Sequence, residues 1–347
     1  MERAVSSAVA HCGRGLAGGR ARRSVALALC AVLTCGVGLH ASAAETKLRL
    51  LSGFDSANPS TLTADAFAAA IAARTGGEYT IARSGPEVVP TLEQLEPASK
   101  GVFNLLFTTG GYHGNRTGVG LVVDTLKVDL DLRYSSGLFD WLDRYYQKNH
   151  NLKLVSLSSG SPYQFLLREP VGADGGLKGR KIRGIPNYAG LIGALGAAMV
   201  SLPPTQIYSS LEKGVIDGAA FPQTAATQYK LQEVIKYMAE PTFGSTHIMI
   251  FVNLDTWKTF PADVQKVFME EGRKTADLYT KYNWRNAEIE VAALKKAGVR
   301  VTNFSPTYAR QIRKLYNEGV WGTAYKAHEA SAREMRAFVD SKRLLNE

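Results

Sequence analysis

Histidines, cysteines and paired carboxylates often perform catalysis or hold metals, and beyond residue 43 they form no recognisable pattern. His113, His150, His247 and His328 include no pair three or four residues apart, so the H-E-x-x-H helix of zinc hydrolases is absent. The G-x-S-x-G turn of serine hydrolases and the Gly-rich Walker loop are absent as well. These absences predict no cofactor and no metal. An exported enzyme whose acid and base carboxylates come from distant segments stays an alternative.

The first 43 residues have the pattern of a secretory signal peptide. A basic patch and then an apolar run of about fourteen residues occupy 20–38, and Ala41-Ser42-Ala43 supplies the small residues that signal peptidase recognises. The run is shorter than the ~20 residues of a membrane-spanning helix, which argues against an N-terminal membrane anchor. A lipid anchor at Cys35 is a second alternative, but Thr34 is a poor residue before a lipidated cysteine. We expect 1–43 to be cleaved and the remainder to be soluble outside the cytoplasm.

Removal of this leader changes the composition in two ways. It takes away all three cysteines, so the remaining chain has no disulfide, no thiolate nucleophile and no cysteine metal site. It also takes away five Arg and one Glu, which lowers the net charge from +10 to +6. The remaining basic residues are scattered singly, which is typical of a solvated surface and predicts no nucleic-acid partner. No later segment is long and apolar enough to span a membrane.

Strand and helix patterns alternate along the rest of the chain. The predicted strands are 47–52, 79–83, 102–108, 152–158, 164–168, 181–183 and 247–253, and the predicted helices are 64–73, 92–100, 136–148, 189–198 and 206–214. Alternation at this spacing predicts an α/β fold with mostly parallel sheets. About 300 residues exceed the usual size of a single core, so we expect two lobes.

The longest predicted element is a helix from Pro261 to Gly298, with Asp263 in its first turn, where a negative charge favours the helix dipole. Apolar residues recur along it at spacings close to whole helical turns. They are Val264, Val267, Phe268, Tyr279, Tyr282, Ile289 and Ala293. Such a helix would be about 54 Å long, more than one lobe needs, so we expect it to cross both lobes. A last helical region follows Ser305-Pro306 and reaches about Leu345.

Several glycines between Gly110 and Gly118 follow the predicted strand 102–108. Loops at the carboxyl ends of strands bind ligands in open α/β folds, and glycines let backbone N–H groups approach an anion. The spacing does not match G-x-G-x-x-G, and the alternative is a flexible connecting loop.

The most informative motifs lie near the middle of the chain. They are L-K-G-R-K-I-R at 177–183, L-G-A at 195–197 and I-Y-S-S-L-E-K-G-V-I-D-G at 207–218. They resemble the second-lobe core of the solute-binding proteins of TRAP (tripartite ATP-independent periplasmic) transporters, whose pattern is roughly L-K-G-x-K-[IL]-R, L-G-A and h-Y-x-A-L-Q-x-G-x-[VI]-D-G. T-G-G at 75–77 and F-P-A-D-V-Q at 260–265 also resemble family segments. The resemblance covers nearly the whole chain after the leader.

The resemblance implies a two-lobe periplasmic solute-binding fold, with a long helix spanning both lobes and a ligand cleft between them. It also implies capture of a small carboxylate-containing solute in the periplasm of a Gram-negative bacterium and delivery to separate membrane permease subunits. We expect 44–160 with 249–285 to form one lobe and 161–248 with 286–347 the other. The alternatives are a binding protein of another transporter class or of a sensor.

The arginine that ends L-K-G-x-K-[IL]-R binds the ligand carboxylate in this family, and Arg183 occupies that position here. A planar guanidinium offers a carboxylate two parallel N–H donors, which a lysine does not. Arg168 ends a predicted strand in the region where some family members have a second basic contact. It is either such a contact or a solvated arginine at a strand end.

The chain departs from the family pattern at Phe221, because D-G-A-A-F-P at 217–222 stands where the family often has D-G-x-x-N-P. Without a side-chain hydrogen bond, Phe221 disfavours a sugar acid or a compact dicarboxylate and favours a ligand with an apolar or aromatic body. The alternative is that Phe221 packs only in the lobe core. Further ligand contacts are expected on loops at strand ends, namely Tyr163, Tyr188, Phe54, Thr109, Gly110 and Tyr112.

Overall fold

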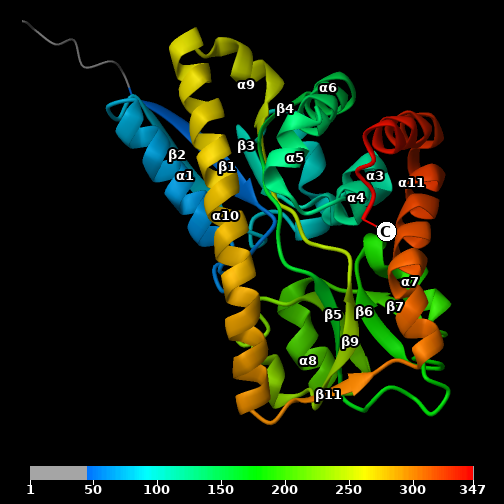
Figure 1. Ribbon diagram of the computed structural model, residues 1–347. Helices are drawn as coiled ribbons and strands as arrows, with labels where there is room; N and C mark the ends of the chain where they lie inside the picture. Colours follow the sequence, from blue (N-terminus) through cyan, green and yellow to red (C-terminus); the bar gives the residue numbers. More distant parts are fainter. Residues whose placement is uncertain (1–44, 347) are drawn as a thin grey trace, which may run out of the picture. The chain divides into compact units, whose positions relative to one another are not determined.

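A computed structural model describes residues 45–346, and the predicted signal peptide at 1–43 lies outside them. The described chain contains two β-sheets with helices packed against both (Figure 1). We call the part built around the five-stranded sheet the first lobe and the part built around the six-stranded sheet the second lobe. This is the two-lobe α/β fold that the sequence predicts.

The sheet of the first lobe has the strand order β2-β1-β3-β10-β4. Its strands are β1 (Thr46–Ser52), β2 (Tyr79–Ser84), β3 (Leu105–Thr108), β4 (Leu152–Leu157) and β10 (Met249–Asn253). β1 pairs in parallel with β2 and β3, whereas β10 lies antiparallel between β3 and β4. The inner strands β3 and β10 are buried along their whole length, which explains their continuous apolar sequences.

The sheet of the second lobe has the order β11-β9-β5-β8-β6-β7. Its strands are β5 (Tyr163–Leu167), β6 (Lys181–Gly184), β7 (Ala198–Ser201), β8 (Gly218–Pro222), β9 (Tyr237–Phe243) and β11 (Arg300–Asn303). β6 is parallel to β7 and β8, but β5 is antiparallel to both β8 and β9. β11 is parallel to β9, so both sheets are mixed, with five parallel and four antiparallel pairings against the expectation of mostly parallel sheets.

The helices match the predicted ones closely where the sequence is strongly periodic. They are α1 (Thr61–Arg74), α2 (Leu95–Ser99), α3 (Gly114–Thr117), α4 (Val119–Val122), α5 (Leu130–Ser135), α6 (Leu138–His150), α7 (Ala189–Ala194), α8 (Ile207–Glu212), α9 (Leu254–Thr259), α10 (Ala262–Lys296) and α11 (Pro306–Lys342). Short 3₁₀ turns are η1 (Thr91–Glu93), η2 (Gly110–Tyr112), η3 (Val123–Thr125), η4 (Pro186–Tyr188), η5 (Pro204–Gln206) and η6 (Leu231–Glu233). Within residues 45–346, no helix has the length and apolar character needed to cross a bilayer.

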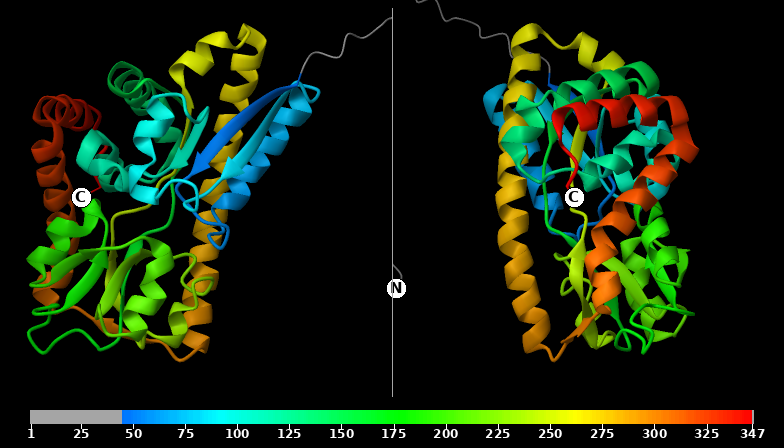
Figure 2. Two further views of the ribbon diagram at one scale, coloured as in Figure 1. Left: turned by 180° about the vertical axis from the view of Figure 1, so that it is seen from behind. Right: turned by 45° about the vertical axis from the view of Figure 1, so that its right-hand side comes forward.

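Helix α10 runs beside both sheets, as both views in Figure 2 also show. At 1.5 Å per residue its 35 residues extend about 52 Å. Its first half packs on α1 and β4, and in its second half Glu290 accepts hydrogen bonds from the backbone N–H and hydroxyl of Thr227 in the second lobe. The predicted apolar face continues only through Tyr279. Ile289 is 55% exposed, because Asn283, Ala287, Glu290 and Leu294 form the buried face instead.

The C-terminal helix α11 contacts both lobes. Non-helical backbone at His328 divides it into two parts. In the first part Gly319 packs against Gly190 of the second lobe, and in the last part the ring of Phe338 stacks 6.3 Å from Trp141 of the first lobe. The predicted assignment of all of 286–347 to the second lobe therefore does not describe the end of α11. The other lobe boundaries stay a prediction.

The contact of α10 with the first sheet leads to a stability prediction at Gly272. A Cβ there would lie 1.9 Å from the carbonyl oxygen of Val155, and the Gly272 carbonyl accepts a 2.7 Å hydrogen bond from Ser156 Oγ. Gly272→Ala should lower the free energy of unfolding by about 1–3 kcal/mol, because α10 must shift away from β4. Urea unfolding followed by circular dichroism measures this change.

Gly322 provides a matched control, since it lies inside a helix and a Cβ there meets no atom within 4 Å. Gly322→Ala should raise the free energy of unfolding by about 0.5–1 kcal/mol through the lower chain entropy of alanine. Equal effects of the two substitutions would contradict the close packing of α10 on β4.

Candidate binding site

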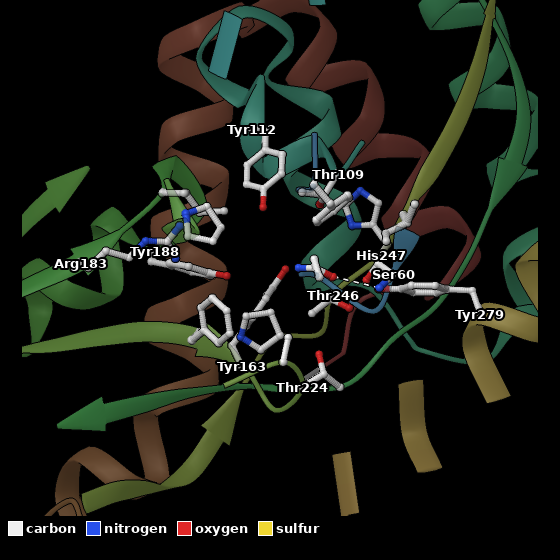
Figure 3. A pocket seen from close by; sticks show the side chains of 18 residues that line it. Ser60, Thr109, Tyr112, Tyr163, Arg183, Tyr188, Thr224, Thr246, His247 and Tyr279 are labelled. Carbon is white, nitrogen blue, oxygen red and sulfur yellow. Dashed lines mark hydrogen bonds between the residues drawn. The ribbon is translucent and has the colours of Figure 1, made fainter. Parts of the chain in front are cut away.

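A cavity lies between the two lobes and encloses about 530 Å³ of empty space, its open mouth included. Side chains of both lobes line it (Figure 3). They are Phe54, Asn58, Ser60, Thr109, Tyr112, Tyr163, Arg183, Ile185, Tyr188, Pro204, Phe221, Pro222, Thr224, Ala225, Thr246, His247, Ile248 and Tyr279.

Arg183 is the charged side chain of this cavity, and it lies near the carboxyl end of β6. It is only 2% exposed. Nε donates to the carbonyl of Leu202 at 2.8 Å, and Nη1 donates to the carbonyl of Ala220 at 3.1 Å. Within residues 45–346 no carboxylate forms an ion pair with it, and the N–H groups of Nη2 have no protein acceptor. The two carbonyls thus orient a guanidinium whose remaining donors are free for a ligand.

Aromatic rings surround this cation. Phe221, on β8, lines the cavity with its ring centroid 5.9 Å from the Arg183 guanidinium carbon. Phe221 is also 3% exposed and part of the apolar core of the second lobe, so it serves the cavity and the core together. Tyr188 and Tyr112 point their hydroxyl groups into the cavity (Figure 3). Burial raises the pKa of both phenols, so they remain protonated hydrogen-bond donors at neutral pH.

Two threonines, Thr109 after β3 and Thr246 in the connection between β9 and β10, contribute buried hydroxyl groups without a protein partner. The Oγ1 atoms of Thr109 and Thr246 have no hydrogen bond within the described part of the chain. Both residues line the cavity, and in Figure 3 they lie across it from Arg183. An unpaired buried hydroxyl costs free energy, and a ligand or a trapped water removes that cost by bonding to it.

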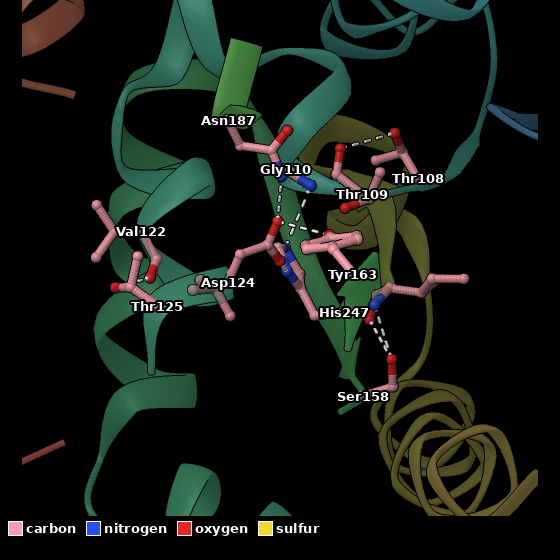
Figure 4. A network of polar contacts seen from close by, with 12 residues as sticks. Thr108, Thr109, Gly110, Val122, Asp124, Thr125, Ser158, Tyr163, Asn187 and His247 are labelled. Carbon is pink, nitrogen blue, oxygen red and sulfur yellow. Dashed lines mark hydrogen bonds and ion pairs between the residues drawn. The ribbon is translucent and has the colours of Figure 1, made fainter. Parts of the chain in front are cut away.

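A network centred on Asp124 joins the two lobes next to the cavity (Figure 4). The Asp124 carboxylate accepts a 2.7 Å hydrogen bond from the Tyr163 hydroxyl and a 2.6 Å bond from the Asn187 amide, both of which belong to the second lobe. The same carboxylate contacts Nδ1 of His247, which lies in the connection between β9 and β10. A buried carboxylate with three donors is well satisfied, so this network favours the arrangement in which the lobes meet.

Hydrogen-bonding contacts engage both ring nitrogens of His247. The backbone N–H of Gly110 donates to Nε2 at 3.2 Å, which requires the lone pair of that nitrogen, and Asp124 fixes the proton on Nδ1. Nε2 is therefore not free to take a proton from a substrate. The Asp124–His247 pair positions the cavity wall and does not form a general-base arrangement.

Most of the site residues expected from the sequence meet at this cavity. Arg183, Phe221, Tyr163, Tyr188, Phe54, Thr109 and Tyr112 all line it. Gly110 does not line it and instead bonds to His247. Tyr163 contributes its ring, since its hydroxyl is committed to Asp124.

Arg168 lies elsewhere, in a surface hollow with Tyr208 and Glu233. The physical reason is the direction of β5, which is antiparallel to β8. Its first residue, Tyr163, pairs with Pro222 at the cavity edge, so Arg168 after its last residue lies at the opposite edge beside Asp217. The expectation that Arg168 contacts the ligand has no support in this geometry.

Sequence reasoning missed the contribution of the segment before β10. Thr246, His247 and Ile248 line the cavity because β10 is antiparallel to β3, so its first residues lie at the edge where β3 ends. Asn58 and Ser60 before α1 and Tyr279 on α10 were also missed as lining residues. Knowing that β10 runs antiparallel to β3 would have identified the segment before β10 as part of the lining. No local sequence motif reveals the direction of that strand.

A hydrogen bond between the two lobes gives a testable coupling. Tyr229 of the second lobe donates to Asp55 Oδ2 of the first lobe at 2.7 Å, and its ring packs edge-on against Phe221. Burial, followed by the hydrogen bond to Asp55, raises the pKa of Tyr229, so the phenol remains a donor. Tyr229→Phe should weaken ligand affinity about 5- to 30-fold, because the closed arrangement loses one charge-assisted bond. Isothermal titration calorimetry measures it.

Tyr208→Phe is the control, because Tyr208 donates to Glu233 at 3.0 Å within one lobe. It removes the same kind of bond without affecting closure, so affinity should stay unchanged. If both variants weakened binding equally, the hydrogen bond between Tyr229 and Asp55 would have no special role in closure.

Comparison with known proteins agrees with this architecture. The family model described as bacterial extracellular solute-binding protein, family 7, matches residues 134–326. A solute-binding protein of Albidiferax ferrireducens is 27% identical over 158 residues, which cover 44% of this chain and 46% of that protein. A monocarboxylate 2-oxoacid-binding periplasmic protein of Nostoc sp. is 21% identical, covering 84% of each chain. The matches span about half the length of the first curated relatives.

Solved structures share the fold. A TRAP periplasmic solute-binding protein from Desulfovibrio salexigens with bound orotic acid superposes with a TM-score of 0.76 at 18% identity, covering 85% of this chain and 98% of that one. A Bordetella pertussis extracytoplasmic solute receptor binding pyroglutamic acid gives 0.74 at 18% identity, covering 86% and 99%. The two-lobe fold and the resemblance to TRAP solute-binding proteins are confirmed. Because the family model matches more than half of its residues, the chain belongs to bacterial extracellular solute-binding protein family 7.

Proposed function

We propose that this protein captures a small organic acid outside the cytoplasm and delivers it to separate permease subunits of a TRAP transporter. The signal-peptide pattern at 1–43 supports export to the periplasm. The observation that carries the binding role is the unpaired cation at Arg183, which lies in an interlobe cavity with free N–H donors.

The chemistry of Arg183 selects an anion. Burial lowers its pKa, and the neighbouring tyrosines only partly oppose that effect. A guanidinium remains charged in proteins, so burying it without a counter-ion is unfavourable. A carboxylate that accepts two parallel N–H bonds from Nη1 and Nη2 removes this penalty. Three relatives fit this chemistry, since orotic acid, pyroglutamic acid and 2-oxoacids all contain a carboxylate, whereas another solved TRAP protein holds sn-glycerol-3-phosphate.

The same contacts support a mechanism of lobe closure. Arg183 is held by the second lobe, whereas Thr109 follows β3 of the first lobe and Thr246 lies in the connection that leads from β9 to β10. An acid bound between them has its full set of partners only when the lobes meet, so it binds the closed form better than the open form. The Asp124 network and the bond between Tyr229 and Asp55 add to the stability of that form.

An enzymatic role finds little support in this geometry. His247 has both ring nitrogens engaged, and among the lining residues of the described chain there is no Asp, Glu or Cys. General acid–base chemistry needs a proton-transferring group within reach of the substrate. The arrangement is that of a receptor.

Arg183→Ala should test the binding role directly. It should reduce affinity for the native acid by about 2–4 kcal/mol, or roughly 30- to 1000-fold, because a buried charge-assisted pair is lost. Arg183→Lys should restore only part of the affinity, since lysine lacks the fork. Mass spectrometry of the compound released on denaturation identifies the acid, and calorimetry measures its Kd.

Arg168→Ala serves as the control, because Arg168 lies away from the cavity and its loss should leave Kd unchanged. Thermal unfolding without ligand separates loss of binding from loss of folding. Normal affinity in a folded Arg183→Ala variant would disprove the assignment of Arg183 as the anion contact.

A further inference from the structure

We infer that the ligand is a monoanion, with one carboxylate at Arg183, an apolar face toward the aromatic rings, and a neutral hydrogen-bonding group at the opposite end beside Thr109 and Thr246. This inference rests on the proposed function and narrows the class of acid that the cavity accepts. Three independent features of the lining lead to it: its charges, its unpaired hydroxyls and its rings.

The charges allow one negative group. Within the described residues, Arg183 is the single Lys or Arg of the lining. On the other side of the cavity, His247 and Tyr163 both contact the Asp124 carboxylate. A buried arginine, Arg133, interacts electrostatically with Asp124, but its guanidinium donates to backbone carbonyls and does not line the cavity. A second carboxylate or a phosphate would thus have no cation of its own in the lining, which is strongly unfavourable.

The unpaired hydroxyls require a polar group at that same end. Thr109 Oγ1 and Thr246 Oγ1 are buried and without a partner, and they lie across the cavity from Arg183 (Figure 3). A hydroxyl group donates one hydrogen bond and accepts others, so it suits a carbonyl, an amide or an alcohol. A purely apolar tail would leave both hydroxyls unsatisfied, and a site built to bond a polar group rejects analogues that lack it.

Aromatic rings form part of the lining. The ring of Phe54 lies 5.4 Å from that of Tyr112 at an angle of 52°, and Phe221 and Ile185 line the cavity as well. Aromatic rings favour a ligand that turns an apolar face or edge toward them. Phe221 has no polar atom with which to bond a ligand hydroxyl. The lining therefore favours a ligand with an apolar face on the side of these rings.

Matched acids test each part of this inference. The probes are 4-hydroxybenzoate and pyroglutamate, which have a neutral polar end, and terephthalate and glutarate, which replace that end by a second carboxylate. Benzoate, which lacks the polar end, completes the set. Thermal shift identifies which probes bind, and calorimetry gives Kd. We expect at least one neutral-ended acid to bind at least about tenfold more tightly than its diacid partner and than benzoate.

Thr109→Val and Thr246→Val remove one hydroxyl each while keeping the side-chain shape. Each should weaken the affinity for the neutral-ended acid about 5- to 10-fold and leave the affinity for benzoate unchanged. Thr307→Val, at an exposed position on α11, is the matched control and should change neither Kd. A loss of affinity for all acids alike would indicate damage to the fold and would contradict a specific role of these hydroxyls.

The outcomes separate this inference from the proposed function. Equal or tighter binding of the diacids, with Arg183→Ala still abolishing it, would overturn the monoanion inference and leave the receptor role intact. Binding of benzoate as tight as 4-hydroxybenzoate would overturn the polar-end assignment. If no acid of either kind bound, and the purified protein released no acid on denaturation, both the inference and the proposed function would be wrong.

Discussion

A positive charge buried without a carboxylate of its own governs the design of this protein. Arg183 is fixed by the carbonyls of Leu202 and Ala220, which satisfy its geometry but do not neutralise it. Such a group is costly in the empty protein, and a bound anion lowers that cost. The cavity therefore favours an anionic ligand. This electrostatic preference is strong because Arg183 is buried among aromatic rings, away from water.

The remaining buried charges are arranged so that they do not compete for that role. Asp124 is negative, yet its oxygens are occupied by Tyr163, Asn187 and His247 and are not offered to Arg183. The two charges thus stay separate while Asp124 holds the lobes together. Had a carboxylate paired with Arg183, the guanidinium would have lost its free donors, and an anionic ligand would have had to displace a protein group. Separation of the two charges is what keeps the cavity receptive.

Much of the fold could be predicted from the sequence because its signals are local. The apolar runs of β3 and β10 indicated buried strands, and the periodicity after Pro261 indicated α10. Arg183 could be identified because a local motif carries it. The buried face of α10 beyond Tyr279 could not be predicted, because the side of the helix that contacts the second lobe there includes polar residues such as Glu290. Asp124 was also out of reach, because it lies in a short 3₁₀ turn without a motif and acts only through residues distant in sequence.

The errors at the site share one physical cause, the direction of two strands. In a parallel sheet, only the carboxyl ends of strands face the ligand. Here β5 and β10 run against their neighbours, so each brings its first residues to the cavity and turns its last residues away. That reversal excludes Arg168 at the end of β5 and brings in Thr246 at the start of β10. Strand direction depends on how the chain crosses between the lobes, which is a long-range property. To locate a binding site in a mixed sheet from sequence, the direction of each strand must therefore be known.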